Sequence, residues 1–530
     1  MHAVLEASPL LKASQYQPVC EELCRLVKEF LDRDKKENFS PLIEAFAREL
    51  EVALLRSFIP DCISWLTHTL MQPSTTGAPD PELPAINAIT GQMLSCLVGD
   101  GWSLESLFSL YRRAFSNDPV HLPAGEAYRF ICALQWVFAR LVSAPKPYVV
   151  TFAINQITDV EAFPPQVGDI QFSVDPPALS GQSELHAKKL ATKDKFRVFA
   201  TMSIPAKDSR IAGMRAASHI EQVLDVVRYD FERKNFHLSE KFLVEKVDRH
   251  IVLEVSRTVP NHKQDMLPGA LHLFMQRLDE LMSNGKLEED AKDRIYSAFR
   301  LYRTGAETGN LENKLVNWWT ALEFLVKAGG AGNIGEAVEN ALYPTVTLAY
   351  LTKHLLAIRA VAHLMRVKLP NPTTGLPVVV GPLPLPDLYR YCQTPAFQTG
   401  LLAAVAAHPY AVLHIGEFLR KITTSKQLGD TLKHHERRVR WQIQRIYRAR
   451  CDIVHSAGRV VQAGLLCANL ESYLKILLDT FLQSLHRHST LHTPKEFFER
   501  QRHTFDRVSA QLASNDNTML MLLLARDTES

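Results

Sequence analysis

Residues 427–456 read QLGDTLKHHERRVRWQIQRIYRARCDIVHS, and their apolar side chains recur at intervals of three and four. This spacing predicts one long amphipathic helix over the whole segment. The predicted apolar stripe consists of Val439, Ile443, Ile446, Tyr447 and Val454. At about 100° per residue, Arg450 falls in the middle of that stripe. Because an isolated buried charge is very costly, Arg450 must be paired or must line a cleft.

Positive charge is concentrated in the same part of the chain. Residues 421–450 carry nine cationic and two anionic side chains, a local net charge of +7, whereas the whole chain carries +3. The cations are Lys421, Lys426, Lys433, Arg437, Arg438, Arg440, Arg445, Arg448 and Arg450. Two interpretations remain open: a track for a phosphate backbone, or a solvated face of a helix.

The first interpretation predicts specific contacts with RNA. We expect phosphate contacts from four of the cations, Lys433, Arg440, Arg445 and Arg448. Trp441 and Tyr447 could both stack on unpaired bases. Tyr447 lies on the apolar stripe and is expected in the core, whereas Trp441 is better placed for exposure.

Further helices are predicted on both sides of this segment. Apolar periodicity favours helices over residues 267–282, 286–302, 311–328, 395–422 and 460–486. A proline-rich segment, Leu369–Pro386, is expected as a loop that interrupts them, with a possible polyproline ligand as the less favoured alternative. The residues after Thr493 are expected as a polar tail whose apolar run, Met519–Leu524, either docks elsewhere or stays mobile.

The first half of the chain divides into a helical and a mixed region. Residues 1–145 show helical periodicity, and the aromatic residues Trp102, Phe108, Tyr111 and Phe115 are expected in their core. Strands are predicted at residues 148–157, 169–174, 196–204, 241–247 and 250–255, with a helix at 210–231. No glycine-rich phosphate loop occurs there, so nucleotide binding has no support.

Composition excludes several classes of protein. The chain has 530 residues, of which 46% are hydrophobic and 22% are charged, values typical of folded globular proteins. Eight cysteines are too few for a disulfide scaffold and lack zinc-finger spacing, so no metal or cofactor is expected. The N-terminus lacks the pattern of a signal peptide, and no apolar run is long enough to span a membrane. We therefore expect a cytoplasmic protein with no membrane contact.

Arg450 and His455 are the strongest candidates for chemistry. Arginine precedes histidine by five positions at three places, Arg257/His262, Arg450/His455 and Arg487/His492, so the spacing alone is weak. Only the middle pair lies on a strongly periodic helix, where His455 is about 140° further round than Arg450. Histidine can move the proton of a ribose 2′-OH, and arginine can stabilise charge on phosphoryl oxygens. The two groups could converge near the end of the helix or come from two chains. The alternative is structural: an ion pair of Arg450 with Glu323, and His455 as a helix cap.

Two segments together resemble the HEPN superfamily, most closely its Apea-like branch. Residues 311–327, LENKLVNWWTALEFLVK, are similar to the opening HEPN helix, and residues 446–458, IYRARCDIVHSAG, are similar to its Arg-x4-His helix. Residues 208–231 also resemble a segment that lies upstream of the HEPN domain in such proteins. The resemblance covers about residues 305–490 well, 200–260 loosely and 1–145 not at all.

The resemblance implies a helical bundle, often a homodimer, whose paired Arg-x4-His helices form a shared cleft. Many members are metal-independent ribonucleases of toxin–antitoxin systems and antiphage defence. By motif position, Arg450 and His455 are the catalytic pair and Glu323 is the acid that helps to hold them. Asp452 and Tyr447 are expected as supporting residues. Cys451 departs from the family, which usually has Asn or another polar residue after the arginine, and some members with altered motifs are inactive binding modules.

The sequence therefore predicts a mainly α protein with a smaller mixed α/β section and a C-terminal HEPN-like helical bundle. The predicted parts are a helical region 1–145, a mixed region 146–265, a helical connector 266–304, an HEPN-like domain 305–490 and a tail 491–530. The expected function is a regulated, metal-independent endoribonuclease with RNA as its partner and an inhibitor or trigger acting on the N-terminal half. The alternatives are a non-catalytic scaffold that binds nucleic acid or protein, and a purely structural bundle.

Overall fold

The computed structural model divides the chain into two compact units, Met1–Ser256 and Arg257–Ser530. It describes residues 21, 22, 25, 45, 57–70, 83–115, 126–157, 160, 163–181, 183–230, 236–246, 249–255, 275, 276, 279, 283, 287–308, 310–326, 334–456, 460, 463–487 and 490–528. Most of residues 1–56, which belong to the region of predicted helical periodicity, and most of the helix expected at 267–282 lie outside the described residues.

The first unit begins with four described helices. They are α4 (Ile59–Leu70), α5 (Leu83–Gly99), α6 (Leu104–Phe115) and α7 (Glu126–Leu141). Their shared core includes Trp102, which is 3% exposed, as its apolar character predicted. Phe108 and Tyr111 do not join it, because they lie on the outer face of α6 at 60% and 59% exposure. The prediction that these two aromatic residues are core was therefore wrong.

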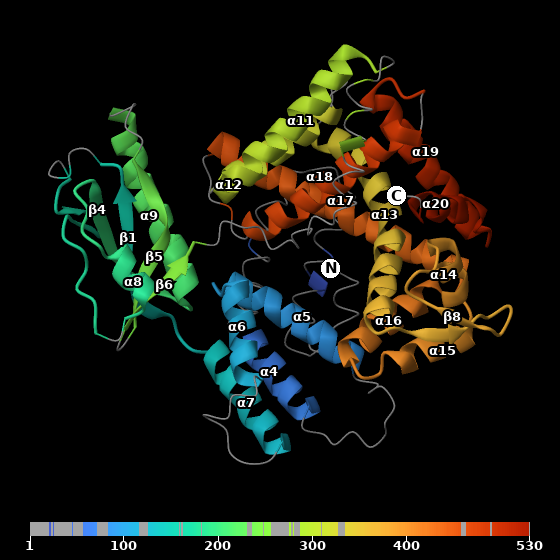
Figure 1. Cartoon of the computed structure of the whole chain (residues 1–530), viewed down its shortest axis with the longest axis horizontal. Coiled ribbons are helices and arrows are strands. Elements are labelled where there is room, and N and C mark those ends of the chain that lie inside the picture. The colour runs from blue at the N-terminus through green and yellow to red at the C-terminus, as the bar shows by residue number, and fades with distance from the viewer. Residues whose placement is uncertain are drawn as a thin grey trace. The chain divides into compact units, whose positions relative to one another are not determined.

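An antiparallel six-stranded sheet forms the rest of this unit. The strands are β1 (Lys146–Asn155), β2 (Gln166–Val167), β3 (Ile170–Ser173), β4 (Arg197–Ala206), β5 (His237–Lys246) and β6 (Arg249–Glu254), in the order β2-β3-β4-β1-β5-β6. The short helix α8 (Leu185–Leu190) precedes β4, and α9 (Ser209–Asp230) lies across one face of the sheet (Figure 1). Gly213 permits this close approach, because a Cβ there would overlap the Phe242 ring. Five of the strands follow the β-branched and aromatic runs that predicted them, whereas β2 was not predicted.

Asp208 joins the helices of this unit to its sheet. Its carboxylate Oδ2 accepts a 2.8 Å hydrogen bond from the Ser103 amide, and its Oδ1 accepts from the amides of Arg210 and Ile211 at the start of α9. Asp208 thus caps α9 and also anchors the loop before α6. Regions 1–145 and 146–265 were predicted as separate, but the first region and the second as far as Ser256 form one compact unit.

The second unit contains a bundle around two tryptophans. Its helices are α11 (Glu289–Glu307), α12 (Leu311–Val326), α13 (Ile334–Leu364), α17 (Ser425–Ser456), α18 (Ala463–Arg487) and α19 (Pro494–Ala513). Trp318 and Trp319 on α12 are at most 1% exposed and lie in the core that these helices share. Since α11 packs on α12, residues 287–307 belong to the bundle and are not a connector.

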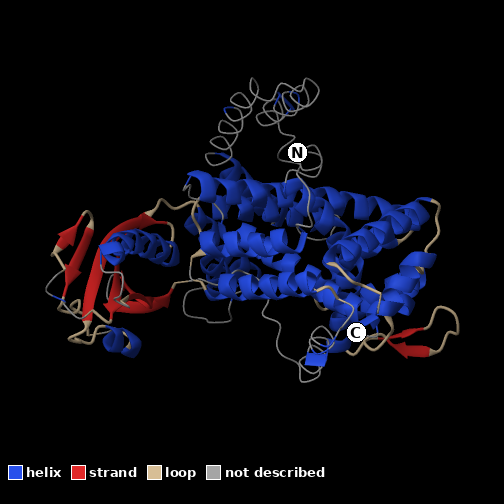
Figure 2. Ribbon diagram, turned by 90° about the horizontal axis from the view of Figure 1, so that it is seen from above, coloured by secondary structure: helices blue, strands red, loops and turns tan. Residues whose placement is uncertain are grey.

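A second core continues along α13. It contains side chains of α14 (Leu385–Cys392), α15 (Pro395–Ala404), α16 (Pro409–Ile422) and α20 (Thr518–Thr528). The proline-rich segment expected as a loop forms a two-stranded hairpin, β7 (Lys368–Pro370) and β8 (Pro377–Val379), visible in Figure 2. The helix expected over 395–422 is two helices, since Pro409 begins the second one.

The C-terminal residues were predicted wrongly as a tail. Phe497 and Phe505 of α19 are buried in the first core of this unit, and Leu520 and Leu524 of α20 are buried in the second. Of the two options for the run Met519–Leu524, docking is the one observed. The described chain is mainly helical with a smaller sheet, which confirms the predicted fold class. None of its described helices is long and apolar enough to cross a membrane.

Candidate functional site

Helix α17 carries most of the predicted site residues. A reciprocal pair of hydrogen bonds begins it: the Gln427 amide donates to Thr424 Oγ1 at 3.2 Å, and the Thr424 amide donates to Gln427 Oε1 at 3.1 Å. This is a capping box, which satisfies two backbone amides that have no partner inside the helix. The helix then runs unbroken to Ser456, so the periodicity of the sequence predicted its extent correctly within two residues.

The buried face of α17 follows the predicted stripe except in its last turn. Val439, Ile443 and Ile446 are at most 1% exposed, as expected. Val454 is 47% exposed, so its assignment to the stripe was wrong. Ala449 and Ile453 contact the core instead. The buried face of the helix therefore shifts around the helix axis in its last turns.

Arg450 lies on this face and is paired. Its Nη2 lies 3.6 Å from Glu323 Oε1 on α12, and the two side chains are 20% and 17% exposed. The same oxygen accepts a 2.6 Å hydrogen bond from Trp319 Nε1. Within the described residues, Arg450 Nε is buried without a hydrogen-bond partner. The predicted pairing of Arg450 with Glu323 is confirmed, and the guanidinium keeps hydrogen-bonding capacity that this contact does not use.

Tyr447 packs beside this pair. Its ring centroid lies 5.5 Å from that of Trp319, and the ring fits against Gly335 of α13, where a Cβ would lie 2.6 Å from Tyr447 Cδ1. Burial is the main cause that raises the pKa of the Tyr447 hydroxyl, and the neighbouring Cys451 adds to the effect. Tyr447 thus packs on α12 and α13, from the face of α17 where the sequence placed it.

His455 points to a different side of the helix. It is exposed in the last turn of α17, and Asp452, one turn earlier, is exposed as well. His455 is five positions after Arg450, so the two side chains point about 140° apart around the helix axis. The two predicted catalytic residues therefore lie on different faces of one helix. A phosphate that contacts both Arg450 and His455 would have to lie at the end of α17. Otherwise a second copy of the chain would have to supply one of the two side chains.

The predicted phosphate contacts divide into two groups. Lys433, Arg445 and Arg448 are exposed. In the parts of the chain that the structure describes, they have no hydrogen-bond or ion-pair partner, and the same is true of Arg437 and Arg438. These five side chains can accept an external anion without first breaking an internal contact.

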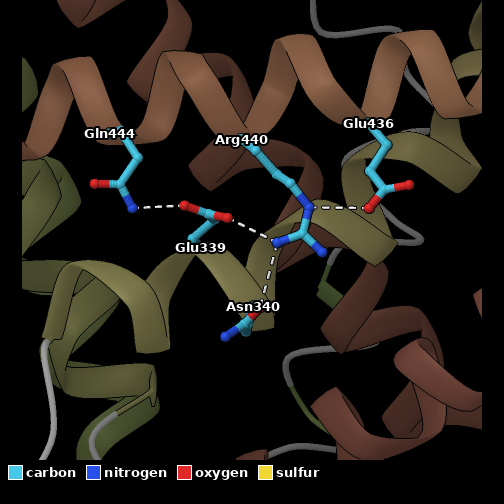
Figure 3. Close-up of polar contacts among 5 residues, drawn as sticks. All are labelled: Glu339, Asn340, Glu436, Arg440 and Gln444. Carbon is cyan, nitrogen blue, oxygen red and sulfur yellow. Dashed lines mark hydrogen bonds and ion pairs between the residues drawn. The ribbon is translucent and has the colours of Figure 1, made fainter. Parts of the chain in front are cut away.

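Arg440 differs from them, because it joins α17 to α13 (Figure 3). Its Nη1 donates to Glu339 Oε1 at 2.7 Å and to Asn340 Oδ1 at 3.3 Å, and its Nε donates to Glu436 Oε1 at 2.9 Å. The guanidinium carbon also lies 3.7 Å from the centroid of the Tyr343 ring. Arg440 therefore does not suit the phosphate contact that its position in the basic segment predicted.

A stack of four rings near the start of α17 had no counterpart in the sequence analysis. His435 lies 4.5 Å from Tyr350, Tyr350 lies 4.2 Å from His354, and His354 lies 4.9 Å from Phe418, measured between centroids. Burial and the cations nearby lower the pKa of His435 to about 4, and burial lowers that of His354. Both histidines are therefore neutral at pH 7. Since α13, α16 and α17 each contribute rings, only the contact of Tyr350 with His354, four residues apart on α13, had a local signal in the sequence.

Trp319 and Glu339 were also missed as contributors to the site. Trp319 and Glu323 are four residues apart on one helix, a spacing that brings side chains together, so that signal was present in the sequence. Glu339 reaches its partners on α17 from more than 100 residues away. Among the described residues, no group of three or more His, Cys, Asp or Glu side chains could hold a metal ion.

No protein-family model, no curated protein and no solved structure matches this chain.

Proposed function

We propose that this chain is a metal-independent endoribonuclease that acts at the C-terminal end of α17. The observation that carries the proposal is the pattern of α17 itself. It combines a face of cations that have no partner among the described residues, an exposed histidine in its last turn and an arginine held by a carboxylate on the opposite side. Cations of this kind hold RNA phosphates, and histidine and arginine together supply the chemistry of strand cleavage.

The reaction would be an internal transesterification. His455 accepts the proton of a ribose 2′-OH, and the 2′-oxygen then attacks the adjacent phosphorus. The bond to the 5′-oxygen breaks, and that oxygen takes up a proton from solvent while His455 releases its proton to solvent, so that the products are a 2′,3′-cyclic phosphate and a 5′-OH. Arg450 stabilises the charge that builds on the non-bridging oxygens. The step requires no oxidant, reductant or metal.

A homodimer would bring the two groups together. Because Arg450 and His455 diverge on one helix, a scissile phosphate can more easily contact Arg450 of one copy and His455 of another. Phe324, next to Glu323 on α12, and Val454 are exposed apolar residues near the end of α17, at 45% and 47%. Burial of such side chains contributes to association between copies.

The resemblance to HEPN proteins suggests the biological setting of this activity. We place it in antiphage defence or a toxin–antitoxin system, with an inhibitor or trigger that acts on the N-terminal half. A cytoplasmic location fits this setting, where the described cysteines, all free thiols, would stay reduced. Growth arrest on expression of the wild-type chain but not of His455→Ala would support this role.

The decisive experiment is cleavage of RNA by the purified full chain with and without EDTA. We expect cleavage that persists in EDTA, yields 2′,3′-cyclic phosphate ends and is lost in His455→Ala and Arg450→Ala. His503→Ala is the matched control, because His503 is an exposed histidine on α19, outside this site. Cleavage that EDTA abolishes, or that His455→Ala retains, would refute the proposal.

A second candidate function is favoured by one observation. Arg450 is paired with Glu323 and faces away from His455, an arrangement that also suits a non-catalytic scaffold which binds RNA through α17. Cys451, which departs from the family pattern, agrees with that alternative. RNA binding with no cleavage, together with growth that wild type and His455→Ala leave equally unaffected, would identify the scaffold.

A further inference from the structure

We propose that the exposed face of α17 is a binding track for single-stranded RNA, with one unpaired base stacked on Trp441. The inference deepens the proposed function by naming the class of substrate and the residue that selects it. Only the choice of RNA as the nucleic acid rests on the proposed function. The cations of the track are Lys433, Arg437, Arg438, Arg445 and Arg448.

Trp441 is the centre of this face. It is 56% exposed, which is unusual for the largest apolar side chain, and only Val454 is another exposed large apolar residue on α17. Arg437 and Arg438 lie one helical turn before it and Arg445 one turn after it, while Arg448 lies two turns after it. The indole is therefore flanked by guanidinium groups on both sides along the same face.

The cations of the track are available for an external partner. In the part of α17 between Lys433 and Arg448, Glu436 is the sole acidic residue, and its carboxylate is engaged by Arg440. The other two acidic residues of the helix, Asp430 and Asp452, lie exposed outside the two ends of the track. The positive face is thus continuous where the indole lies and is limited by negative charge at each end.

The length of the track fits a short piece of single strand. At 1.5 Å of rise per residue, Arg437 and Arg448 are about 16 Å apart along the helix, and Arg437 and His455 about 27 Å. A strand of a few nucleotides would span the cations and continue to His455. The path places one base at Trp441 and a later phosphate at the end of the helix, where cleavage is proposed.

The exposed indole favours a single strand over a duplex. An aromatic side chain stacks on a base whose flat face is open, whereas paired bases in a duplex are already stacked on one another. A duplex would use the arginines and leave the indole without a role. A lipid surface fits less well, because a helix that lies in a membrane interface presents a broad apolar face, and here Trp441 is nearly alone.

Binding and cleavage can be tested separately. The probe is a fluorescent decamer of 2′-O-methyl RNA, which the proposed reaction cannot cleave, alone or annealed to its complement, with binding to the full chain measured by anisotropy. We expect the single strand to bind at least tenfold more tightly than the duplex. Trp441→Leu should weaken single-strand binding at least fivefold, whereas Trp441→Phe should retain most of it. Trp136→Leu, which changes a 44% exposed tryptophan on α7, should have no effect.

The salt dependence of binding tests the contribution of the arginines. Replacement of Arg445 and Arg448 by Gln should reduce the slope of log affinity against log salt by about 1.4, which corresponds to two phosphate contacts on a single strand. Arg507→Gln on α19 is the matched control with an exposed arginine. Thermal unfolding should be unchanged in all these variants, since each replaced side chain is exposed or partly exposed.

Several outcomes would overturn the inference. They are unchanged binding in Trp441→Leu, equal affinity for the duplex, or equally tight binding of an acidic peptide, which would identify a site for acidic proteins. Binding that meets these expectations without any cleavage of unmodified RNA would leave the track standing and refute the nuclease. Cleavage that depends on His455, together with unchanged binding in Trp441→Leu, would support the nuclease and refute the track.

Discussion

Glu323 Oε1 lies 3.6 Å from Arg450 Nη2 and also accepts a 2.6 Å hydrogen bond from Trp319 Nε1. One carboxylate oxygen on α12 thus holds the guanidinium of α17 and an indole of the core at the same time. The contact makes a cation tolerable in the middle of an apolar stripe, since the charge has a partner and the partner is itself fixed.

Removal of the negative charge at Glu323 should destabilise the fold. Glu323→Gln keeps an oxygen for the Trp319 indole but leaves the Arg450 guanidinium, only one-fifth exposed, without its counter-charge. We expect a loss of about 1–2 kcal/mol in the free energy of unfolding, measured by denaturant titration. The exposed pair Arg303–Glu307 is the control, and Glu307→Gln should cost less than about 0.5 kcal/mol. Equal effects of the two substitutions would contradict a structural role for the Glu323 pair.

Arg440 and Arg445 should differ in what their loss affects. Arg440→Ala removes hydrogen bonds to Glu339, Asn340 and Glu436, and should lower the free energy of unfolding by about 2–4 kcal/mol. Arg445→Ala removes an exposed cation that has no partner in the described part of the chain, so it should change stability by less than about 0.5 kcal/mol while it weakens RNA binding. Urea titration and anisotropy on both variants measure the two effects. If Arg445→Ala proves the more destabilising variant, the assignment of roles is wrong.

Gly335 should not tolerate a side chain. A Cβ at this position would lie 2.6 Å from the Tyr447 ring, and the ring also packs on Trp319. Gly335→Ala should therefore destabilise the protein by about 1–3 kcal/mol, measured as a fall in the midpoint of urea unfolding.

Gly416 in α16 provides the control for this substitution. The nearest atom to a Cβ at Gly416 is 3.7 Å away, which is ordinary contact, so Gly416→Ala should be neutral or stabilise by up to about 1 kcal/mol. A stable Gly335→Ala variant would show that Tyr447 can move away from α13.

The ring stack predicts a loss of stability in mild acid. Burial lowers the pKa of His435 to about 4, and four neighbouring groups add to the effect: Arg438, His354, His434 and Lys353. A histidine in the unfolded chain has a pKa of about 6.5. Below pH 6.5 the unfolded chain therefore binds a proton that the folded chain does not. The free energy of unfolding should fall as the pH drops from about 6.5 to 4, by roughly 2 kcal/mol between pH 6.5 and 5.

His435→Phe keeps a ring in the stack and removes the titrating group. The variant should lose less stability than wild type between pH 6.5 and 5 in urea titrations at each pH. His503→Phe is the control, because His503 is exposed. The same pH dependence in wild type and His435→Phe would rule out His435 as the source.

Much of the fold followed from patterns within short segments. The intervals of three and four in residues 427–456 predicted α17, because a helix places such residues on one face. The β-branched runs predicted the strands of the sheet for a similar local reason. Apolar character alone was a poorer guide to burial, since Phe108 and Tyr111 are aromatic like the buried Trp102 yet face outward. Which face of α6 is covered depends on helices elsewhere in the chain.

The sequence by itself determined that α17 is amphipathic, that it carries an excess of cations and that Arg450 needs a partner. These are local properties, set by the helical period and by the cost of burying a charge. Only the tertiary structure decided which of these cations have an internal partner and which have none among the described residues. Arg440 and Arg445 are alike in sequence context, but Arg440 meets a carboxylate 101 residues away on α13, and Arg445 meets none among the described residues. Because such contacts join distant segments, they arise only when the helices pack.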